Sequence, residues 1–370
     1  MNDSIRHFRA RLAALAASTL CFAGCMTDEK LTETAPDKGY VFAVTSDAKY
    51  KEGNYSAVGL DSSFTRTNID PIHPDAAVRF FGGDDIFVIN RLGRDNLQII
   101  DKQNLKTVMQ VGFPKLSNPY DVAIKDGLIY VALFAKDSIL IYDQKDGSEK
   151  GAIDVHAYAD SDGFAEATAL KFVGEDLYAI LANLDSKAYY APTAKSTLVK
   201  IDVKAKKVAK ALELSLGNPA GITYDETAGK LYIPCIGKYT ESDFVTLVLD
   251  GGILSVDLAT FAEGSMLATE KDLGGNVGKT LLYQGKLLFD LGVADGERIL
   301  AYGISDKQIT DIVKLNPYKG GGMAVDPGTR TLCIGDRMKG LRLFNLEDFK
   351  EKTASNIDLG LLPSDLAVIR

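Results

Sequence analysis

Short apolar runs recur along the chain, and four of them make up one repeating unit. In residues 118–155 the runs are Val122–Ile124, Leu128–Leu133, Ile139–Tyr142 and Gly151–Val155, with turn residues between them. Each run has the length and the β-branched and aromatic content of a strand. A unit this small cannot bury both faces of its own sheet, so neighbouring copies must stack on it. The pattern therefore predicts an array of four-stranded sheets.

The unit occurs seven times in residues 39–370, about 47 residues per copy. Six copies are continuous, and the seventh is divided between the two ends of this region. The last run, Pro363–Ile369, is a single strand, whereas Tyr40–Val44, Ala57–Asp61 and Phe64–Ile69 supply three. Joining them completes the last unit and removes the exposed edges of an open array. We therefore expect an all-β, seven-bladed β-propeller whose C-terminal strand joins the N-terminal three.

The outermost strands and the cysteines complete this prediction. The pattern places outer strands at Met266–Leu273 in the fifth unit and Ala354–Leu359 in the seventh, and no segment combines a helical period with caps. The repeats contain Cys235 and Cys333, each in the second strand of its unit, and the two units are not adjacent. We expect buried free thiols rather than a disulfide.

The segment that precedes the repeats is typical of export. Residues 1–24 have an arginine-containing start and an apolar stretch from about Leu12 to Phe22, too short for a stop-transfer helix. The end of this segment, Phe-Ala-Gly-Cys, resembles the lipobox of bacterial lipoproteins, which implies a signal peptide followed by a lipidated Cys25. Residues 25–38 suit a flexible tether. The alternative is an ordinary cleaved signal in which Cys25 has no role. Because Met26 is not Asp, the resemblance to bacterial lipoprotein sorting favours the outer membrane.

The charge of the chain narrows its partners. The formal net charge is −8, which disfavours binding to nucleic acid and to anionic lipid. No stretch after residue 25 is long and apolar enough to span a membrane. We therefore expect membrane attachment through a lipid anchor only, no nucleic-acid partner, and a monomer.

One repeat carries a family resemblance. Residues 86–96 (IFVINRLGRDN), followed by Leu97–Asp101, resemble the YVTN repeat of seven-bladed propellers in the YncE-like group. The resemblance extends over nearly all of residues 39–370. It implies the propeller fold and an envelope or surface location, and it supplies no catalytic residue set.

Long loops indicate where binding residues lie. With four antiparallel strands per unit, the loops 154–166, 183–196 and 236–252 emerge on one face of the ring and belong to neighbouring units. Long loops on a rigid scaffold commonly carry binding residues. These loops contain five aromatic residues suited to a partner interface: Tyr158, Tyr189, Tyr190, Tyr239 and Phe244. The alternative is that these rings pack only against their own loops.

Charged residues are expected at the mouth of the central channel on the same face. They are Arg91, Arg94, Asp95, Asp336 and Arg337. Converging charges of both signs suit a polar ligand. A solvated rim of exposed ion pairs is the alternative, and such pairs stabilise little.

Metal and catalytic signatures are sparse. Residues Asp160 and Asp162, with Gly163 and Glu166 following, place carboxylates at alternate positions as calcium loops do, but the spacing is not that of an EF-hand. We therefore expect no cofactor, with calcium at Asp160 and Asp162 as the one exception. The nucleophile-elbow, phosphate-loop and zinc-protease motifs are missing. A lactonase-like cluster of Asp95, Asp336, Arg91 and His156 is not specified by any spacing.

These observations favour binding over catalysis. We expect an outer-membrane-anchored propeller lipoprotein of the cell envelope that acts as a platform for an envelope protein or an extracellular polysaccharide. One alternative is a propeller hydrolase of the lactonase type, working at the channel mouth. Another is a purely structural surface protein. The fold by itself does not decide among them.

Overall fold

A computed structural model describes one compact unit of the chain. The described residues are 38–61, 63–188, 190–192, 194–238, 248–315, 320–338 and 340–370. Cys25, the preceding segment 1–24 and the tether up to residue 37 lie outside them. Among the described residues, no helix has the length and apolar character needed to cross a membrane.

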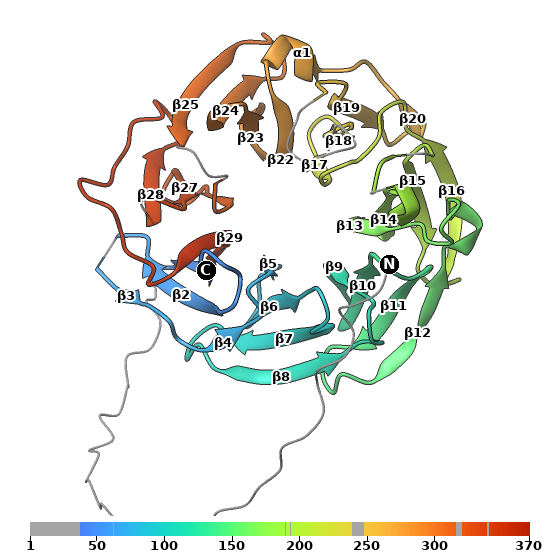
Figure 1. Cartoon of the computed structure of the whole chain (residues 1–370), viewed down its shortest axis with the longest axis horizontal. Helices are drawn as coiled ribbons and strands as arrows, with labels where there is room; N and C mark the ends of the chain where they lie inside the picture. Colours follow the sequence, from blue (N-terminus) through green and yellow to red (C-terminus); the bar gives the residue numbers. More distant parts are fainter. Residues whose placement is uncertain are drawn as a thin grey trace, which may run out of the picture. The chain divides into compact units, whose positions relative to one another are not determined.

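Seven antiparallel sheets stand around a common axis, each with its first strand innermost (Figure 1). The seven-bladed propeller is thus confirmed. Blade 1 contains β29 (Leu362–Ile369), β1 (Tyr40–Ser46), β2 (Gly53–Gly59), β3 (Thr65–Arg66) and β4 (Pro71–Ile72). Blade 2 contains β5 (Ala76–Phe80), β6 (Asp85–Asn90), β7 (Asn96–Asp101) and β8 (Thr107–Gly112). Blade 3 contains β9 (Pro119–Lys125), β10 (Leu128–Leu133), β11 (Ser138–Asp143) and β12 (Glu149–Asp154).

The remaining blades follow in chain order. Blade 4 contains β13 (Ala167–Val173), β14 (Asp176–Leu181), β15 (Thr197–Asp202) and β16 (Lys207–Glu213). Blade 5 contains β17 (Thr223–Asp225), β18 (Lys230–Cys235), β19 (Gly252–Asp257), β20 (Ala262–Glu263) and β21 (Ala268–Thr269). Blade 6 contains β22 (Asn276–Tyr283), β23 (Lys286–Val293), β24 (Gly296–Gly303) and β25 (Ile309–Leu315). Blade 7 contains β26 (Met323–Asp326), β27 (Thr331–Asp336) and β28 (Gly340–Asn345). Short helices are η1 (His156–Tyr158), η2 (Ser186–Ala188) and α1 (Glu270–Leu273).

The ring closes as the sequence predicts. Strand β29 pairs antiparallel with β1 from Tyr40 opposite Ile369 to Ser46 opposite Leu362. The last residue fastens the joint, because Arg370 Nε donates to Asp326 Oδ1 at 3.1 Å and Nη1 donates to the Lys38 carbonyl at 3.1 Å. The C-terminal strand therefore completes the first sheet and ties it to blade 7.

Apolar side chains fill the spaces between neighbouring sheets. One buried cluster joins Tyr130 and Ile141 of blade 3 to Leu170 and Leu177 of blade 4. Similar clusters lie between the other blades. Each sheet thus buries both faces, which explains why its strands are so strongly apolar. Cys235 and Cys333 are free and buried within these clusters, as expected.

The prediction for residues 266–273 is wrong, because the strand is only two residues long and a helical turn follows it. Thr269 caps α1 by accepting a hydrogen bond from the Asp272 N–H at 3.1 Å. The buried Glu270 carboxylate then accepts hydrogen bonds from the N–H groups of Gly251 at 3.0 Å and Val277 at 2.9 Å. These local hydrogen bonds replace the ladder that a continuous outer strand would form.

The strand expected at residues 354–359 is also absent, so the described part of blade 7 has three strands. Only two isolated bridges cover its outer edge, Leu341 with Ile357 and Phe344 with Glu351. The Arg342 guanidinium holds Glu351 there through two hydrogen bonds, of 2.8 and 2.7 Å. Side-chain pairing therefore fastens this segment where a backbone ladder was expected.

The antiparallel order places two sets of connections on one side of the ring. These are the connections between the second and third strands of each blade, and those from one blade to the next. We call this side the loop face. The hairpins between first and second strands lie on the opposite face.

Candidate functional site

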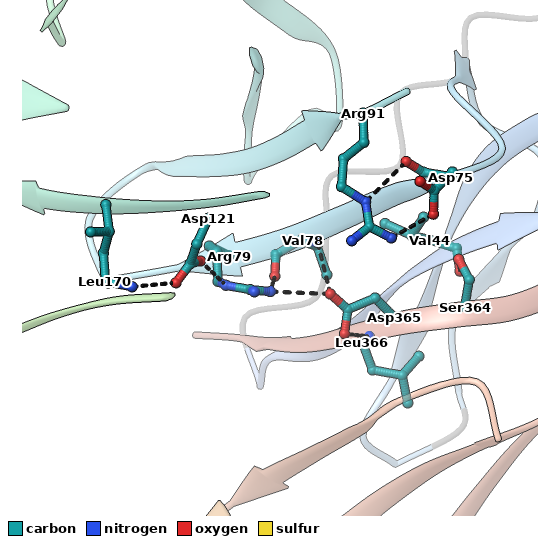
Figure 2. A network of polar contacts seen from close by, with 10 residues as sticks. All are labelled: Val44, Asp75, Val78, Arg79, Arg91, Asp121, Leu170, Ser364, Asp365 and Leu366. Carbon is teal, nitrogen blue, oxygen red and sulfur yellow. Dashed lines mark hydrogen bonds and ion pairs between the residues drawn. The ribbon is translucent and has the colours of Figure 1, made fainter. Parts of the chain in front are cut away.

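A network of charged side chains lies on the innermost strands (Figure 2). At its centre, Arg79 of β5 bridges two carboxylates from other blades. Its Nε donates to Asp121 Oδ1 of β9 at 2.7 Å, and its Nη1 donates to Asp365 Oδ2 of β29 at 3.1 Å. One guanidinium thus joins blades 1, 2 and 3 at the axis.

Backbone groups complete the network. Asp365 Oδ2 also accepts the Val78 N–H at 3.0 Å, and Asp121 Oδ2 accepts the Leu170 N–H of blade 4 at 2.9 Å. Burial works against the charge on Arg79, but the adjacent carboxylates of Asp121 and Asp365 outweigh it and raise its pKa. Burial likewise opposes ionisation of Asp365, yet its cationic neighbours and the amide hold its pKa below the usual value.

Lys279 faces the same region from the other side of the ring. It lies at a bulge of β22, where the pairing register shifts between Val277 and Thr280, and bulges redirect side chains. Among the described residues, none makes a hydrogen bond or ion pair with its ammonium group. Asp365 favours the charged form, but burial and the positive charges of Arg79 and Arg91 prevail and lower the pKa of Lys279.

Arg91 connects the axis to the loop face. It follows β6 and pairs with Asp75, with Nη2 to Oδ1 at 2.5 Å. Its guanidinium carbon lies 4.9 Å from the centre of the Tyr120 ring, within the range of a cation–π contact. The ring of Tyr120 then begins a line of aromatic side chains.

Three aromatic residues lie edge to edge across blades 3 and 4. The ring centres of Tyr120 and Phe134 are 5.4 Å apart, and those of Phe134 and Tyr190 are 5.9 Å apart. Both spacings suit tilted aromatic pairs. Tyr190 is 51% exposed, so the line ends in solvent. Only Tyr190 of these three was predicted as a binding residue.

Two exposed leucines flank this line, and Asp95 holds their loops. Asp95 is buried, and its two oxygens accept the N–H groups of Leu116 at 2.8 Å and Asn118 at 2.9 Å. The Asn118 side chain in turn accepts the Leu92 N–H at 3.2 Å. Leu92 is 63% exposed and Leu116 is 75% exposed. Asp95 was predicted to bind a ligand, and its oxygens instead bond to these backbone groups.

Large exposed apolar residues gather on the loop face. Six of the ten found among the described residues lie in its connections: Tyr50, Leu92, Leu116, Tyr190, Val248 and Met338. Of these, Leu92, Leu116 and Tyr190 adjoin Tyr120 and Phe134, and we call these five residues the loop-face patch. The loop face is therefore the side that is best suited to a partner.

The other predicted mouth residues are divided among separate contacts. Arg94 is exposed. Asp336 is buried and accepts the Met338 N–H at 2.9 Å and an Arg342 N–H at 3.3 Å. Arg337 donates to the Tyr50 hydroxyl at 2.9 Å and lies over its ring, beside a pocket of about 270 Å³ between blades 7 and 1.

No described contact joins Asp95, Asp336, Arg91 and His156, the four residues considered for a lactonase-like cluster. His156 pairs instead with Asp137, with its Nδ1 at 3.3 Å from a carboxylate oxygen. Tyr158 is half-buried and packs onto the core between blades 3 and 4. Tyr189, Tyr239 and Phe244 lie outside the described residues.

Sequence reasoning missed the axial residues Arg79, Asp121, Lys279 and Asp365. One signal for two of them was present, since Pro119-Tyr-Asp121 and Pro363-Ser-Asp365 place an Asp at the same step of two innermost strands. In both strands the residue before the Asp is skipped by the pairing register. The repeat therefore aims both carboxylates at the axis.

Comparisons with solved structures support the fold. The chain is similar to a proposed 6-phosphogluconolactonase from Bacteroides fragilis, with a TM-score of 0.64 at 12% identity over 90% of this chain and 99% of that one. A proposed 6-phosphogluconolactonase from Bacteroides uniformis gives a TM-score of 0.64 at 10% identity, over 90% of this chain and 100% of that one. Hydrazine synthase from Kuenenia stuttgartiensis gives 0.54 at 14% identity, over 72% and 74%. No family model and no curated protein matches the sequence.

Acid is expected to weaken the axial network and the ring closure together. The pKa values of Asp365 and Asp326 are lowered from 3.8, each against the opposing effect of burial, the first by Lys279 and Arg79 and the second by Arg370. Their stabilising contribution is therefore complete above about pH 4 and is lost as the pH falls through the folded-state values. The melting temperature measured from pH 7 to pH 3 should fall below pH 4. The variant Asp365→Asn should show a shallower fall, and an unchanged slope in this variant would contradict the assignment.

Proposed function

We propose that this protein is a binding protein of the cell envelope that holds a partner protein on its loop-face patch. In this proposal residues 1–24 are a signal peptide, Cys25 is lipidated, and residues 25–38 tether the ring to the outer membrane. The resemblance to YVTN-repeat propellers supports the same location. A rigid ring with one apolar face suits such a platform, because little ordering entropy is lost when a partner docks.

The observation that carries the proposal is the backbone beneath the two leucines. Leu92 has φ of 43° and Leu116 has φ of 58°, which is the left-handed region that favours glycine. Each such residue costs about 1 kcal/mol or more of folding free energy. Their exposed side chains return little of this cost by packing. Strained positions that present apolar side chains to solvent are expected where the side chains contact a partner.

The composition of the patch favours a protein partner over a polysaccharide. It combines two leucines with three aromatic rings and a neighbouring arginine, Arg91. Aromatic residues and arginine are enriched at protein interfaces, where their burial contributes most of the affinity. Catalysis ranks below binding, because Arg79 and backbone amides already engage the carboxylates of Asp121 and Asp365.

The test is capture of a partner from envelope extracts by the tagged protein. The double variant Leu116→Gly and Tyr190→Ala should lose the captured protein, with an affinity loss of at least tenfold. Because glycine relieves the left-handed strain at position 116, the melting temperature should stay the same or rise. Lost capture will then not reflect unfolding.

The matched control is Phe81→Ala on the opposite face. Phe81 is 47% exposed, close to the exposure of Tyr190, so its truncation should leave capture intact. Capture that survives the double variant would contradict the proposal. A captured polysaccharide instead of a protein would contradict the choice of partner, and no capture by either protein would favour a purely structural role.

A further inference from the structure

Carboxylates from two loops converge between blades 3 and 4. Asp160 and Asp162 belong to the connection between β12 and β13, and Asp185 belongs to the connection between β14 and β15. One carboxylate oxygen of each lies within 4.8 Å of the corresponding oxygens of the other two. Oxygens that each lie 2.3–2.6 Å from one calcium ion are at most about 5 Å apart. The spacing therefore matches a shared cation.

We propose that Asp160, Asp162, Asp185 and the adjacent Glu166 form a calcium-binding site. This inference goes beyond the proposed platform function and does not depend on it. Calcium takes six to eight oxygen ligands in flexible geometry, which irregular loops with several carboxylates supply. Magnesium suits the site less well, because it requires near-octahedral geometry and retains several waters.

Glu166 provides an observation independent of the three aspartates. It is 1% exposed, and its Oε2 accepts the Leu184 N–H at 3.0 Å. Among the described residues, none donates a hydrogen bond to its Oε1. The charges of Asp160, Asp162 and Asp185 all act on it, which places its carboxylate beside theirs. A buried carboxylate with an unused oxygen, facing three others, lacks a cation.

The charge balance points the same way. In the described part of the chain, no lysine, arginine or histidine forms an ion pair with any of these four carboxylates. The ammonium of Lys187 donates to the Ser161 carbonyl at 2.8 Å rather than to a carboxylate. Oδ2 of Asp160 is shielded from solvent and receives no hydrogen bond from the described residues. Uncompensated buried carboxylates destabilise a fold, and a divalent cation offsets their charge.

The chain orients these groups before any ion binds. Asp162 accepts the N–H groups of Phe164 and Ser186, both at 2.9 Å. Asp185 accepts the Lys187 N–H at 2.7 Å and the Ser161 hydroxyl at 2.5 Å. These hydrogen bonds link the two loops and hold each carboxylate while leaving lone pairs for a metal.

The site would also support the loop-face patch. The Asp185 carbonyl accepts the Tyr190 N–H at 2.8 Å, and the Asp185 N–H donates to the Ala191 carbonyl at 3.1 Å. An ion held by the Asp185 carboxylate would therefore stiffen the turn that presents Tyr190. Calcium would then order one end of the patch.

The experiment is calorimetric titration of calcium chloride into the full-length protein after removal of metals with a chelator. We expect one binding event per chain and a melting temperature that rises with calcium concentration. Asp162→Asn and Asp185→Asn should each weaken binding at least tenfold, and circular dichroism should confirm that both variants remain folded. The matched control is Asp295→Asn, an exposed carboxylate paired with Lys314 at 2.5 Å on blade 6, which should bind calcium normally.

Three outcomes would overturn the proposal. They are no calcium binding by the parent, calcium binding that is undiminished in both folded aspartate variants, and tighter binding of magnesium than of calcium. If one aspartate variant fails to fold, the other, together with the response of the parent's melting temperature, still decides the question.

Discussion

A chain that ends at residue 361 is expected to lose cooperative folding, because β29 is the innermost strand of blade 1. Without it, β1 keeps one edge unpaired, from Tyr40 to Ser46. Leu366 and Ile369 leave the clusters on the two sides of that blade, and Asp365 leaves the axial network. Unpaired strand edges also promote aggregation. Thermal unfolding followed by circular dichroism should show no sigmoidal transition, or a transition far below that of the parent.

The control for this truncation is Arg370→Ala, which keeps β29 and removes only the terminal guanidinium. Asp326 is 2% exposed and retains its hydrogen bonds from Gly328 and Thr329. Loss of one charged partner should therefore cost about 1–3 kcal/mol and leave a cooperative transition. A truncated chain that melts at the temperature of the parent would contradict closure by β29.

Replacing the axial arginine should be the most damaging single substitution. In Arg79→Met the aliphatic stem is roughly preserved, but Asp121 and Asp365 lose the cation that bridges them. Breaking a buried ion pair by removing one partner costs about 3–5 kcal/mol, because the remaining charge is left uncompensated. Chemical denaturation should show a loss of this size, with the midpoint shifted and the slope unchanged.

Arg298→Met provides the matched comparison. Arg298 also pairs with an aspartate, Asp311, through an Nε bond of 2.7 Å, but both side chains are far more exposed than the axial pair. An exposed pair of this kind contributes about 0–1 kcal/mol. Equal losses in the two variants would contradict a structural role for the axial network. Arg79→Lys should fall between them, because one ammonium cannot match the planar, multi-donor geometry of the guanidinium.

The fold was predictable because the period and the divided seventh unit are properties of the apolar pattern. Closure by Pro363–Ile369 followed from simple complementation of strands, and the pairing of β29 with β1 confirms it. The outer strands were less predictable, since they bury only one side. At residues 266–273 the side chains of Thr269 and Glu270 bond to nearby backbone and end the strand, and no apolar period records such bonds.

The candidate site was predicted only in part. The long loops pointed to the correct face, and Tyr190 lies in the patch. Tyr120 and Phe134 sit at strand ends rather than in long loops, so loop length gave no reason to select them. Asp95 looked like a ligand-binding acid because its charge was visible, but the two amides that its carboxylate accepts belong to a loop about twenty residues later. The Arg79 bridge spans three blades, a relation that only the closed ring creates.

The measurement that tests the central claim most directly is photo-crosslinking in intact cells, with a crosslinking amino acid in place of Leu116 or of Phe81. Leu116 lies in the loop-face patch and Phe81 on the opposite face, and both side chains reach solvent. The account predicts a discrete protein adduct from position 116 and none from position 81. The same adducts from both positions, or no adduct from position 116, would contradict the assignment of the loop face as the binding surface.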